Sequence, residues 1–325
     1  MKKMRQSLDE TERRIVAALM ASPRASWRTI AEVLGVSERT VVRRAAPLLH
    51  DGTLRATAVR TPSSFPDLIP LALRIRCQPN RVSAIAATLA RRSDSLWVDV
   101  LGGGDEICVM FHLRGPAERN NLLLHDLPAT SAVQSWTSHV MLKVFPADIN
   151  WSAGLLTATE RTALRHRAMN TPNGSAIVPF GDPMIAALVD DGRASYADLA
   201  DRTGTTALTA RRRLNTLLDG GFLRLVTEID LALLGIGTEA LIWMNVAPAH
   251  LGTIADQLSR HPEVRLVAAT TGPHNLLVAV AVADLAALYC FLTETIGDLA
   301  HITAMEVTPT LTGLKRAGQI RPGSL

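Results

Sequence analysis

Four polar residues at helical spacing form the clearest chemical signal in this sequence. In the segment SERTVVRRAAPLLH, a helix of about 100° per residue places Arg39, Thr40, Arg43 and Arg44 along one side. The opposite side then carries the apolar residues Val41, Ala45 and Leu48. Arginine can donate two hydrogen bonds to guanine, and arginine and hydroxyl groups can bind phosphate. This stripe therefore predicts a helix that enters a DNA major groove.

The residues before this helix complete a helix-turn-helix pattern. Gly35 allows a left-handed turn, and Ser37 can cap the following helix by accepting a backbone N–H. Arg28, at the start of the preceding helix, is a candidate phosphate contact. Pro47 predicts that the reading helix kinks or ends there, because its ring clashes with a carbonyl one turn earlier. The alternative interpretation of the basic stripe is a solvated helix face.

The charge distribution indicates a polyanionic partner. The chain of 325 residues has a net charge of +4, yet residues 1–60 hold twelve Lys and Arg against six Asp and Glu. A basic N-terminal block on a slightly acidic remainder is typical of a head that binds double-stranded DNA. Aromatic residues make up only 4% of the chain, which disfavours a platform for stacking single-stranded bases.

The sequence repeats itself after 169 residues. With this shift, 16 of the 41 residues from Ile15 to Arg55 are identical in the second copy. The arginine pair is retained as Arg212 and Arg213, whereas Leu208 takes the place of Arg39. The repeat therefore predicts a second helix-turn-helix head.

The second head differs from the first in its charge. Residues 182–224 balance six Arg against six Asp. Because nonspecific DNA affinity depends on uncompensated positive charge, we expect this head either to bind DNA weakly or to act as a structural partner of the first. On this hypothesis two or more chains supply their first heads to one DNA site, and the protein is a homo-oligomer.

After each head the hydrophobic pattern alternates between strand and helix. The first copy predicts strands over 71–77, 96–101, 106–113 and 133–142 and helices over 80–92 and 116–125. The second copy repeats the strands over 240–246, 265–269, 276–282 and 302–311 and the helices over 251–260 and 285–295. The order βαββαβ is typical of a ferredoxin-like module. We therefore expect an α+β protein with two copies of a helix-turn-helix (winged-helix-like) head, each followed by a ferredoxin-like βαββαβ ligand-binding module.

These elements divide the chain into five segments. We expect a helix-turn-helix domain at 1–60, a ferredoxin-like domain at 66–146, and a linker at 147–181 with a helix over 159–169. The second helix-turn-helix domain then spans 182–227, and the second ferredoxin-like domain spans 237–314.

A glycine-containing turn between the middle strands of each module is the second candidate site. Its backbone N–H groups can approach a carboxylate, and an adjacent acidic side chain can pair with an ammonium group, so an amino acid suits the site. The alternative is an ordinary hairpin turn. The candidate effector-binding residues are Gly103, Asp105 and Glu106 in the first copy and Thr271, Gly272, His274 and Asn275 in the second.

Motifs for catalysis and for metal or cofactor binding are absent from the sequence. It contains no P-loop, no HExxH and no paired CxxC, and its three cysteines are too few for a disulfide framework. We therefore predict no catalytic residues, no metal site and no cofactor. The N-terminus lacks the apolar stretch of a signal peptide, and the longest apolar run has eight residues, against about 20 for a membrane span. These features predict a cytoplasmic protein without a membrane partner.

Several segments together resemble a known family. LDETERRIVAAL, IAEVLGVSERTVVRR and LLHDGTLR, followed by the βαββαβ pattern, resemble the leucine-responsive/asparagine-responsive (Lrp/AsnC) transcriptional regulators, here in a tandem-duplicated form. The resemblance implies a sequence-specific DNA-binding regulator in which the ferredoxin-like domains at 66–146 and 237–314 are effector and oligomerisation domains that pair through their sheets. It also implies that DNA affinity responds to a small-molecule effector, an amino acid or a similar metabolite.

Two other functions stay open from the sequence. Siroheme decarboxylases also resemble this architecture, with a His- and Arg-rich strand segment around the tetrapyrrole, and here the corresponding stretch offers only Arg265 and His274. The other alternative is a metabolite sensor that binds no DNA.

Overall fold

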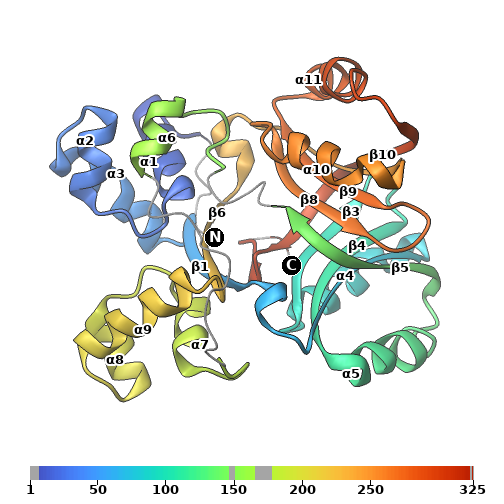
Figure 1. Ribbon diagram of the computed structural model, residues 1–325, viewed down its shortest axis with the longest axis horizontal. Helices are drawn as coiled ribbons and strands as arrows, with labels where there is room; N and C mark the ends of the chain where they lie inside the picture. Colours follow the sequence, from blue (N-terminus) through green and yellow to red (C-terminus); the bar gives the residue numbers. More distant parts are fainter. Residues whose placement is uncertain (1–6, 146–150, 165–177, 323, 325) are drawn as a thin grey trace. The chain divides into compact units, whose positions relative to one another are not determined.

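The computed structural model describes residues 7–145, 151–164, 178–322 and 324. The chain divides into two units whose segments alternate along the sequence. One consists of Met1–Pro66 with Ile149–Leu234, and the other of Asp67–Asp148 with Gly235–Leu325. The first unit contains both helix-turn-helix heads, and the second contains the strands of both ligand modules (Figure 1).

Each head of the first unit consists of three helices and one strand. The first head contains α1 (Glu10–Ala21), α2 (Trp27–Leu34), α3 (Glu38–His50) and β1 (Leu54–Arg60). The second contains α7 (Pro183–Asp190), α8 (Tyr196–Thr203), α9 (Ala207–Asp219) and β6 (Leu223–Ile229).

The segment predicted as a linker contributes to the same unit. Its helix α6 (Ala158–Leu164) packs on α1 and α2, and Trp151, Leu156 and Leu164 are buried. The rest of the helix predicted over 159–169, and most of the loop that follows it, lie outside the described residues.

The turns before α3 and α9 are built alike. Gly35 and Gly204 have φ angles of 68° and 65°, in the left-handed region that residues with a side chain rarely adopt. The hydroxyl oxygens of Ser37 and Thr206 each accept a hydrogen bond from the N–H three residues later, at 3.1 and 3.2 Å. These caps satisfy the free N–H groups at the starts of the helices and set where α3 and α9 begin.

The helix α3 continues past Pro47 and ends only at His50. Leu48, the next residue, is fully buried, so the packing of this last turn offsets the hydrogen bond that proline cannot make. The structure thus excludes an end of the helix at Pro47.

The two heads contact each other through corresponding residues of the repeat. β1 and β6 pair in an antiparallel ladder over their full lengths (Figure 1). Arg24 donates a hydrogen bond to the carbonyl of Gly192 at 2.9 Å, and its repeat counterpart Arg193 donates one to the carbonyl of Pro23 at 2.5 Å. Each head therefore supplies the same contact to the other, as a two-fold axis requires.

The same arginines also lie over aromatic rings of the opposite head. Arg24 lies 5.3 Å from the ring centre of Tyr196, and Arg193 lies 4.3 Å from that of Trp27. Tyr196 and Trp27 are themselves repeat counterparts. Burial, together with the nearby Arg24, lowers the pKa of Arg193 to about 10. The heads form a pseudo-two-fold pair within one chain.

The second unit is built on strands from both copies of the repeat. The first copy supplies β2 (Leu68–Cys77), β3 (Ser95–Leu101), β4 (Glu106–Arg114) and β5 (Val133–Phe145). The second supplies β7 (Thr238–Val246), β8 (Val264–Thr270), β9 (Leu276–Val282) and β10 (Ile302–Arg316), with the short β11 (Gln319–Ile320) folded back on β10. Their orders, β3-β4-β2-β5 and β8-β9-β7-β10, are the same. Because β5 pairs with β8 and β10 pairs with β3, the eight long strands form one closed sheet (Figure 1).

This closed sheet joins the two expected modules into one barrel, so the structure does not show two distinct ferredoxin-like modules. Both copies have the predicted order βαββαβ, but their two four-stranded sheets are hydrogen-bonded to each other. β5 and β10 extend to Phe145 and Arg316, beyond the ends predicted at 142 and 311. Their additional residues pair with β8 and β3 of the other copy, which the pattern within one copy does not reveal.

Helices cover the outer face of the closed sheet. They are α4 (Val82–Arg91), α5 (Gly115–Asn121), α10 (Leu251–Ser259) and α11 (Leu285–Cys290). α5 and α11 continue into the short π-helices Leu122–Asp126 and Phe291–Ile296. Leu71, Leu73 and Ile75 of β2 pack outward in the same core as α4. The alternate residue Ala72 packs in a separate core with Trp243 and Leu277 inside the sheet. The middle of the interior is therefore apolar.

None of the helices in the described ranges combines the length and the apolar character that a bilayer span requires.

Candidate nucleic-acid interface and ligand pocket

The reading face of α3 presents two of the three predicted arginines. Arg39 and Arg43 are exposed, on the side of the helix away from the buried Val41. The hydroxyl of Thr40 lies 2.8 Å from that of Ser37, so both groups belong to the helix cap. Arg39 and Arg43 are thus the guanidinium groups of this stripe that a duplex can reach.

Arg44 is bound within the head instead. Its guanidinium lies 2.6 Å from the carboxylate of Asp9 and 3.4 Å from that of Glu12. These two acids also form the capping box at the start of α1, so Arg44 ties α3 to α1. Arg28, at the start of α2, is highly exposed and pairs with Glu32 one turn later at 2.9 Å.

α9 repeats this division of roles. Arg213 pairs with Asp182, the cap of α7, at 2.5 Å, as Arg44 pairs with the cap of α1. Arg212 is exposed, as is Arg43 in the first head. Arg211 is exposed as well, and it was missed as a candidate although the triplet RRR is plain in the sequence.

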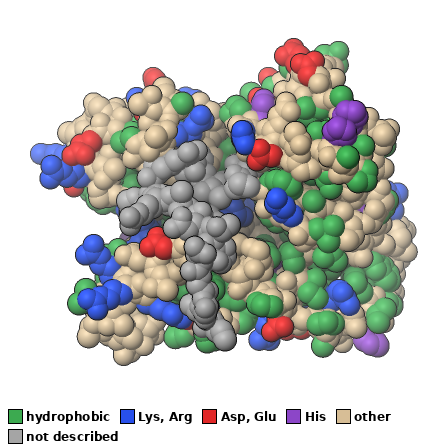
Figure 2. Space-filling model, viewed as in Figure 1, with side chains coloured by type: hydrophobic (Ala, Val, Ile, Leu, Met, Phe, Trp, Pro, Cys, Tyr) green, Lys and Arg blue, Asp and Glu red, His purple; other side chains and the backbone are tan. Residues whose placement is uncertain are grey.

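The two reading helices are equally basic. α3 and α9 each carry three arginines and one acidic residue. The second head is neutral only as a whole, because its aspartates lie mostly on its other helices and turns. Figure 2 shows Lys and Arg side chains at the surface of both heads on the face that it draws. Both heads therefore expose basic side chains of the kind that contact a phosphate backbone.

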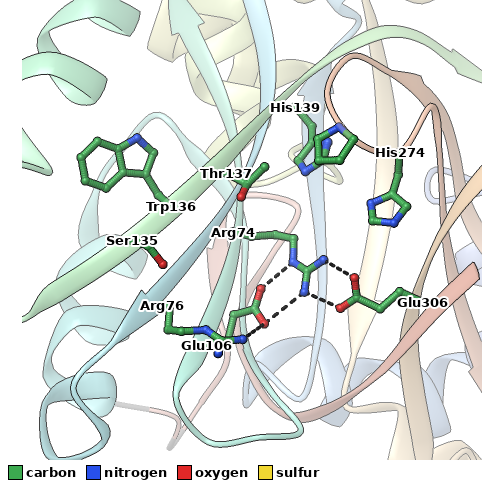
Figure 3. A pocket seen from close by; sticks show the side chains of 10 residues that line it. Arg74, Arg76, Glu106, Ser135, Trp136, Thr137, His139, His274 and Glu306 are labelled. Carbon is green, nitrogen blue, oxygen red and sulfur yellow. Dashed lines mark hydrogen bonds and ion pairs between the residues drawn. The ribbon is translucent and has the colours of Figure 1, made fainter.

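A pocket of about 390 Å³ opens at one end of the closed sheet (Figure 3). Its lining combines both copies of the repeat, with side chains from β2, β4, β5, β10 and the turn between β8 and β9. This volume lies near the lower end of the range for small-molecule sites, about 300 to 1,000 Å³.

Arg74 of β2 bridges two carboxylates in the wall of this pocket (Figure 3). Its guanidinium donates to Glu106 of β4 at 2.5 and 3.1 Å and to Glu306 of β10 at 2.6 and 2.9 Å. The hydrogen bond from Arg74 holds the pKa of Glu306 below its usual value. Arg74 also lies over the buried ring of Trp243, 5.6 Å from its centre. The positive charge of Arg74 is therefore compensated within the protein by these two carboxylates.

His139 of β5 is buried beside Arg74 and Trp243. Its Nδ1 lies 2.9 Å from the carbonyl oxygen of Thr271, and because that oxygen can only accept, Nδ1 carries the proton. Its Nε2 then has a free lone pair and no hydrogen-bond partner within the described residues. Burial lowers the pKa of His139, so the ring is neutral at pH 7. Trp243 Nε1 and His274 Nδ1 are likewise buried without a partner in the described part of the chain.

The predicted turn of the first copy contributes one residue to the pocket. Glu106 lines it, whereas Gly103 and Asp105 lie in the adjoining turn. The carboxylate of Asp105 is 3.8 Å from the guanidinium of Arg76, which is 55% exposed and lines the pocket.

In the turn of the second copy, the side chains of two predicted residues form hydrogen bonds with backbone groups. His274 lines the pocket. The hydroxyl of Thr271 accepts from the N–H of Val140 at 2.9 Å, and the side chain of Asn275 bonds both backbone groups of Val246. At Gly272, which has φ 97°, an added Cβ would lie 2.8 Å from His139 Nδ1, so only glycine fits.

Several lining residues were missed in the sequence. They are Arg74, Arg76, Ser135, Trp136, Thr137, His139, Pro273 and Glu306. The sequence did contain one indication of this pocket. The segment LALRIRC places two arginines at alternate positions of an otherwise apolar strand, so both lie on the same face of that strand.

The other end of the closed sheet is filled by buried ion pairs. Arg316 is 1% exposed and pairs with Asp99, which is also 1% exposed. Glu239 accepts from Arg265, Arg316 and Arg321 at 3.1, 3.3 and 3.0 Å. The guanidinium of Arg265, which sequence analysis considered for a tetrapyrrole site, is therefore engaged within this cluster.

No group of three or more His, Cys, Asp or Glu within the described ranges has an arrangement that could hold a metal ion.

Comparison with known families assigns the parts of the chain. The sequence model of the AsnC-type helix-turn-helix domain matches residues 8–49, and that of a winged helix-turn-helix DNA-binding domain matches residues 184–224. The model of the Lrp/AsnC ligand binding domain matches residues 239–320. Two helix-turn-helix heads with a ligand-binding sheet define a DNA-binding transcriptional regulator.

Proteins of similar sequence identify the family of this chain. An uncharacterized HTH-type transcriptional regulator of Pyrococcus horikoshii is 31% identical over 135 residues, which are 41% of this chain and 85% of that protein. The Bkd operon transcriptional regulator of Pseudomonas aeruginosa is 29% identical over 128 residues, 38% of this chain and 83% of that protein. The chain belongs to the Lrp/AsnC family of transcriptional regulators, in a form that carries the unit twice.

One solved structure matches both copies at once. The siroheme decarboxylase NirDL aligns with 95% of this chain and 93% of its own, with a TM-score of 0.60 and 10% sequence identity. At this identity the likeness concerns the fold.

Proposed function

We propose that this regulator binds its operator through α3 and α9 and that a small zwitterionic metabolite, such as an amino acid, modulates this binding from the pocket. In this proposal each four-stranded half of the closed sheet is a ferredoxin-like effector module. The observation that carries the proposal is the pocket itself, which has charged groups of both signs and buried nitrogen atoms without partners.

The charge balance of the pocket favours a zwitterion. Arg74 and Arg76 oppose Glu106 and Glu306, and His139 is neutral. A ligand with a net charge would leave one of these groups uncompensated, whereas a ligand with one carboxylate and one ammonium preserves the balance.

Two partly exposed groups suit the ends of such a ligand. Arg76 is 55% exposed, and its nearest carboxylate oxygens are both at 3.8 Å, so its guanidinium can turn to a ligand carboxylate. Glu306 is 43% exposed and can accept from an ammonium group while it remains bonded to Arg74. Trp136 supplies apolar surface for the ligand's side chain.

The effector proposal is tested by calorimetric titration of the full chain with the natural amino acids. We expect Arg76→Ala to weaken binding of the best ligand about ten- to a hundredfold, the loss expected for one hydrogen bond to a charged group. Arg260→Ala removes an exposed arginine of the same unit that pairs with Asp256 four residues earlier, and this variant should bind the ligand normally. Equal affinities of the two variants would contradict the proposal.

The DNA proposal is tested by selecting duplexes from a random pool with the full chain. We expect affinity for the selected duplex to fall steeply with salt and Arg43→Ala to lower it about tenfold or more. If no duplex is enriched even at low salt, a metabolite sensor without DNA binding is favoured. If the ligand changes DNA affinity by some factor, DNA must change ligand affinity by the same factor, which checks the coupling.

A decarboxylase on this scaffold is the alternative, and it is favoured by the histidines and arginines of the pocket. Two features count against it. Glu106 and Glu306 would face the several carboxylates of a tetrapyrrole, and Arg74 is already engaged by both of them. The test is incubation with an iron tetrapyrrole, because a bound one would add a strong absorption band to the purified protein.

A further inference from the structure

The two reading helices present different side chains at corresponding positions. On the side of α3 away from its buried face, the exposed residues include Arg39, Val42 and Arg43. The 169-residue shift gives Leu208, Arg211 and Arg212 at these positions of α9, and all three are exposed.

One of the three positions is the same in both heads. Arg43 and Arg212 are exposed, while the arginine that follows each of them is tied to the first helix of its own head. Both heads therefore offer one common guanidinium at the centre of the reading face.

At the other two positions, an arginine and an aliphatic residue change places between the two helices. Leu208, which is 58% exposed, replaces Arg39, and Arg211 replaces Val42. The second guanidinium is thus displaced by three residues, about 4.5 Å along the helix axis at 1.5 Å per residue. Arginine binds O6 and N7 of guanine, whereas an aliphatic side chain contacts the methyl group of thymine. Two helices that differ in this way match different base sequences.

The pairing of the heads holds these unlike helices in one molecule. The β1–β6 ladder and the reciprocal bonds of Arg24 and Arg193 join the two heads without a second chain. α3 and α9 each carry three arginines and one acidic residue. The phosphate backbone should therefore attract the two helices about equally.

We propose that one chain recognises a non-palindromic DNA site, in which one half-site is read by Arg39 and Arg43 and the other by Leu208, Arg211 and Arg212. This inference rests on the proposed binding of DNA by both heads. It replaces the expectation that several chains supply only their first heads.

Selection of duplexes from a random pool, followed by footprinting, gives the two half-sites, here named A and B. Affinities of the full chain are then measured for the composite duplex AB and for the palindromes AA and BB at the same spacing. We expect AB to bind at least tenfold more tightly than either palindrome, with one chain per duplex. A palindrome selected from the pool, or one that binds as tightly as AB, would overturn the inference.

Exchange variants identify which helix reads which half-site. The double substitution R39L/V42R gives α3 the side chains that α9 carries at these two positions, and L208R/R211V gives α9 those of α3. All four positions are exposed, so melting temperatures should remain near that of the parent chain. We expect the first variant to prefer BB and the second to prefer AA, each by at least tenfold over AB. Variants that fold as the parent does and retain its preference for AB would also overturn the inference.

The two proposals fail in different ways. If no duplex is enriched at low salt, the proposed DNA binding is wrong, and the inference falls with it. If a palindrome is enriched and bound by two chains through Arg43 alone, DNA binding stands and only the non-palindromic site is wrong.

Discussion

The two ends of the closed sheet use charge in opposite ways. At one end, Arg316 and Asp99 are each 1% exposed and their ion pair is closed to solvent. At the other, Arg76 and Glu306 remain about half exposed around a pocket. Fully buried ion pairs fill the interior, whereas half-exposed ones leave groups that a ligand can contact.

Neither end could form in a symmetric pair of identical units. The repeat places Trp243 at the position of Arg74, Thr137 at that of Glu306, and Ala268 at that of Asp99. In a homodimer each residue near the two-fold axis faces its own copy, so Arg74 would face a second arginine. In one chain the two copies can differ, and here their residues at these positions are complementary.

The largest effect is expected at the closed end. Arg316→Met leaves Asp99 buried without its ion-pair partner, and loss of one partner of a buried pair costs about 3 to 5 kcal/mol. Urea unfolding of the full chain should show this loss, while Arg260→Met, at a highly exposed arginine, should change the free energy of unfolding by less than about 0.5 kcal/mol. A loss below about 1 kcal/mol at Arg316 would mean that this end does not stabilise the fold.

A smaller effect is expected at the pocket end. Arg74→Met leaves Glu106 and Glu306 without their shared cation, in a site that water can enter, and we expect a loss of about 1 to 3 kcal/mol. The loss should shrink when Glu306 is also changed to Gln, because one of the two charges is then removed. If Arg74→Met cost as much as Arg316→Met in the same urea titration, the contrast between the two ends would not hold.

The smallest effect concerns the pH dependence of stability. The pKa of His139 is lowered by burial, so the unfolded chain binds more protons near pH 6.5 than the folded chain does. The contribution of His139 to the free energy of unfolding is therefore full at pH 8 and falls as pH drops through about 6.5. Subtracting the profile of His139→Gln from that of the parent chain between pH 8 and 5 should show this slope. A flat difference would indicate that His139 is not buried in the folded protein.

The sequence predicted the heads well because their signals are local. The turn glycines, the hydroxyl caps and the apolar spacing all lie within a few residues of one another, and the family models match both heads. Arg44 was assigned to DNA because helical spacing alone does not show that Asp9 lies within reach of it.

The pocket could not be predicted in the same way. Arg74 and Glu306 are 232 residues apart in the chain and meet only when β10 closes the sheet. The turn glycines attracted attention because they are conspicuous in sequence, but most of that turn bonds to the backbone. Charged residues at alternate positions of an apolar strand were the better indicator of the site.

The contacts of Arg24 and Arg193 also bear on how the protein responds to its own concentration. In a regulator whose heads pair by association of two chains, the paired fraction falls on dilution. Here the second head is tethered to the first, so its effective concentration is set by the length of the chain and not by the number of molecules. Occupancy of the operator should then rise with the first power of protein concentration, even at a few copies per cell.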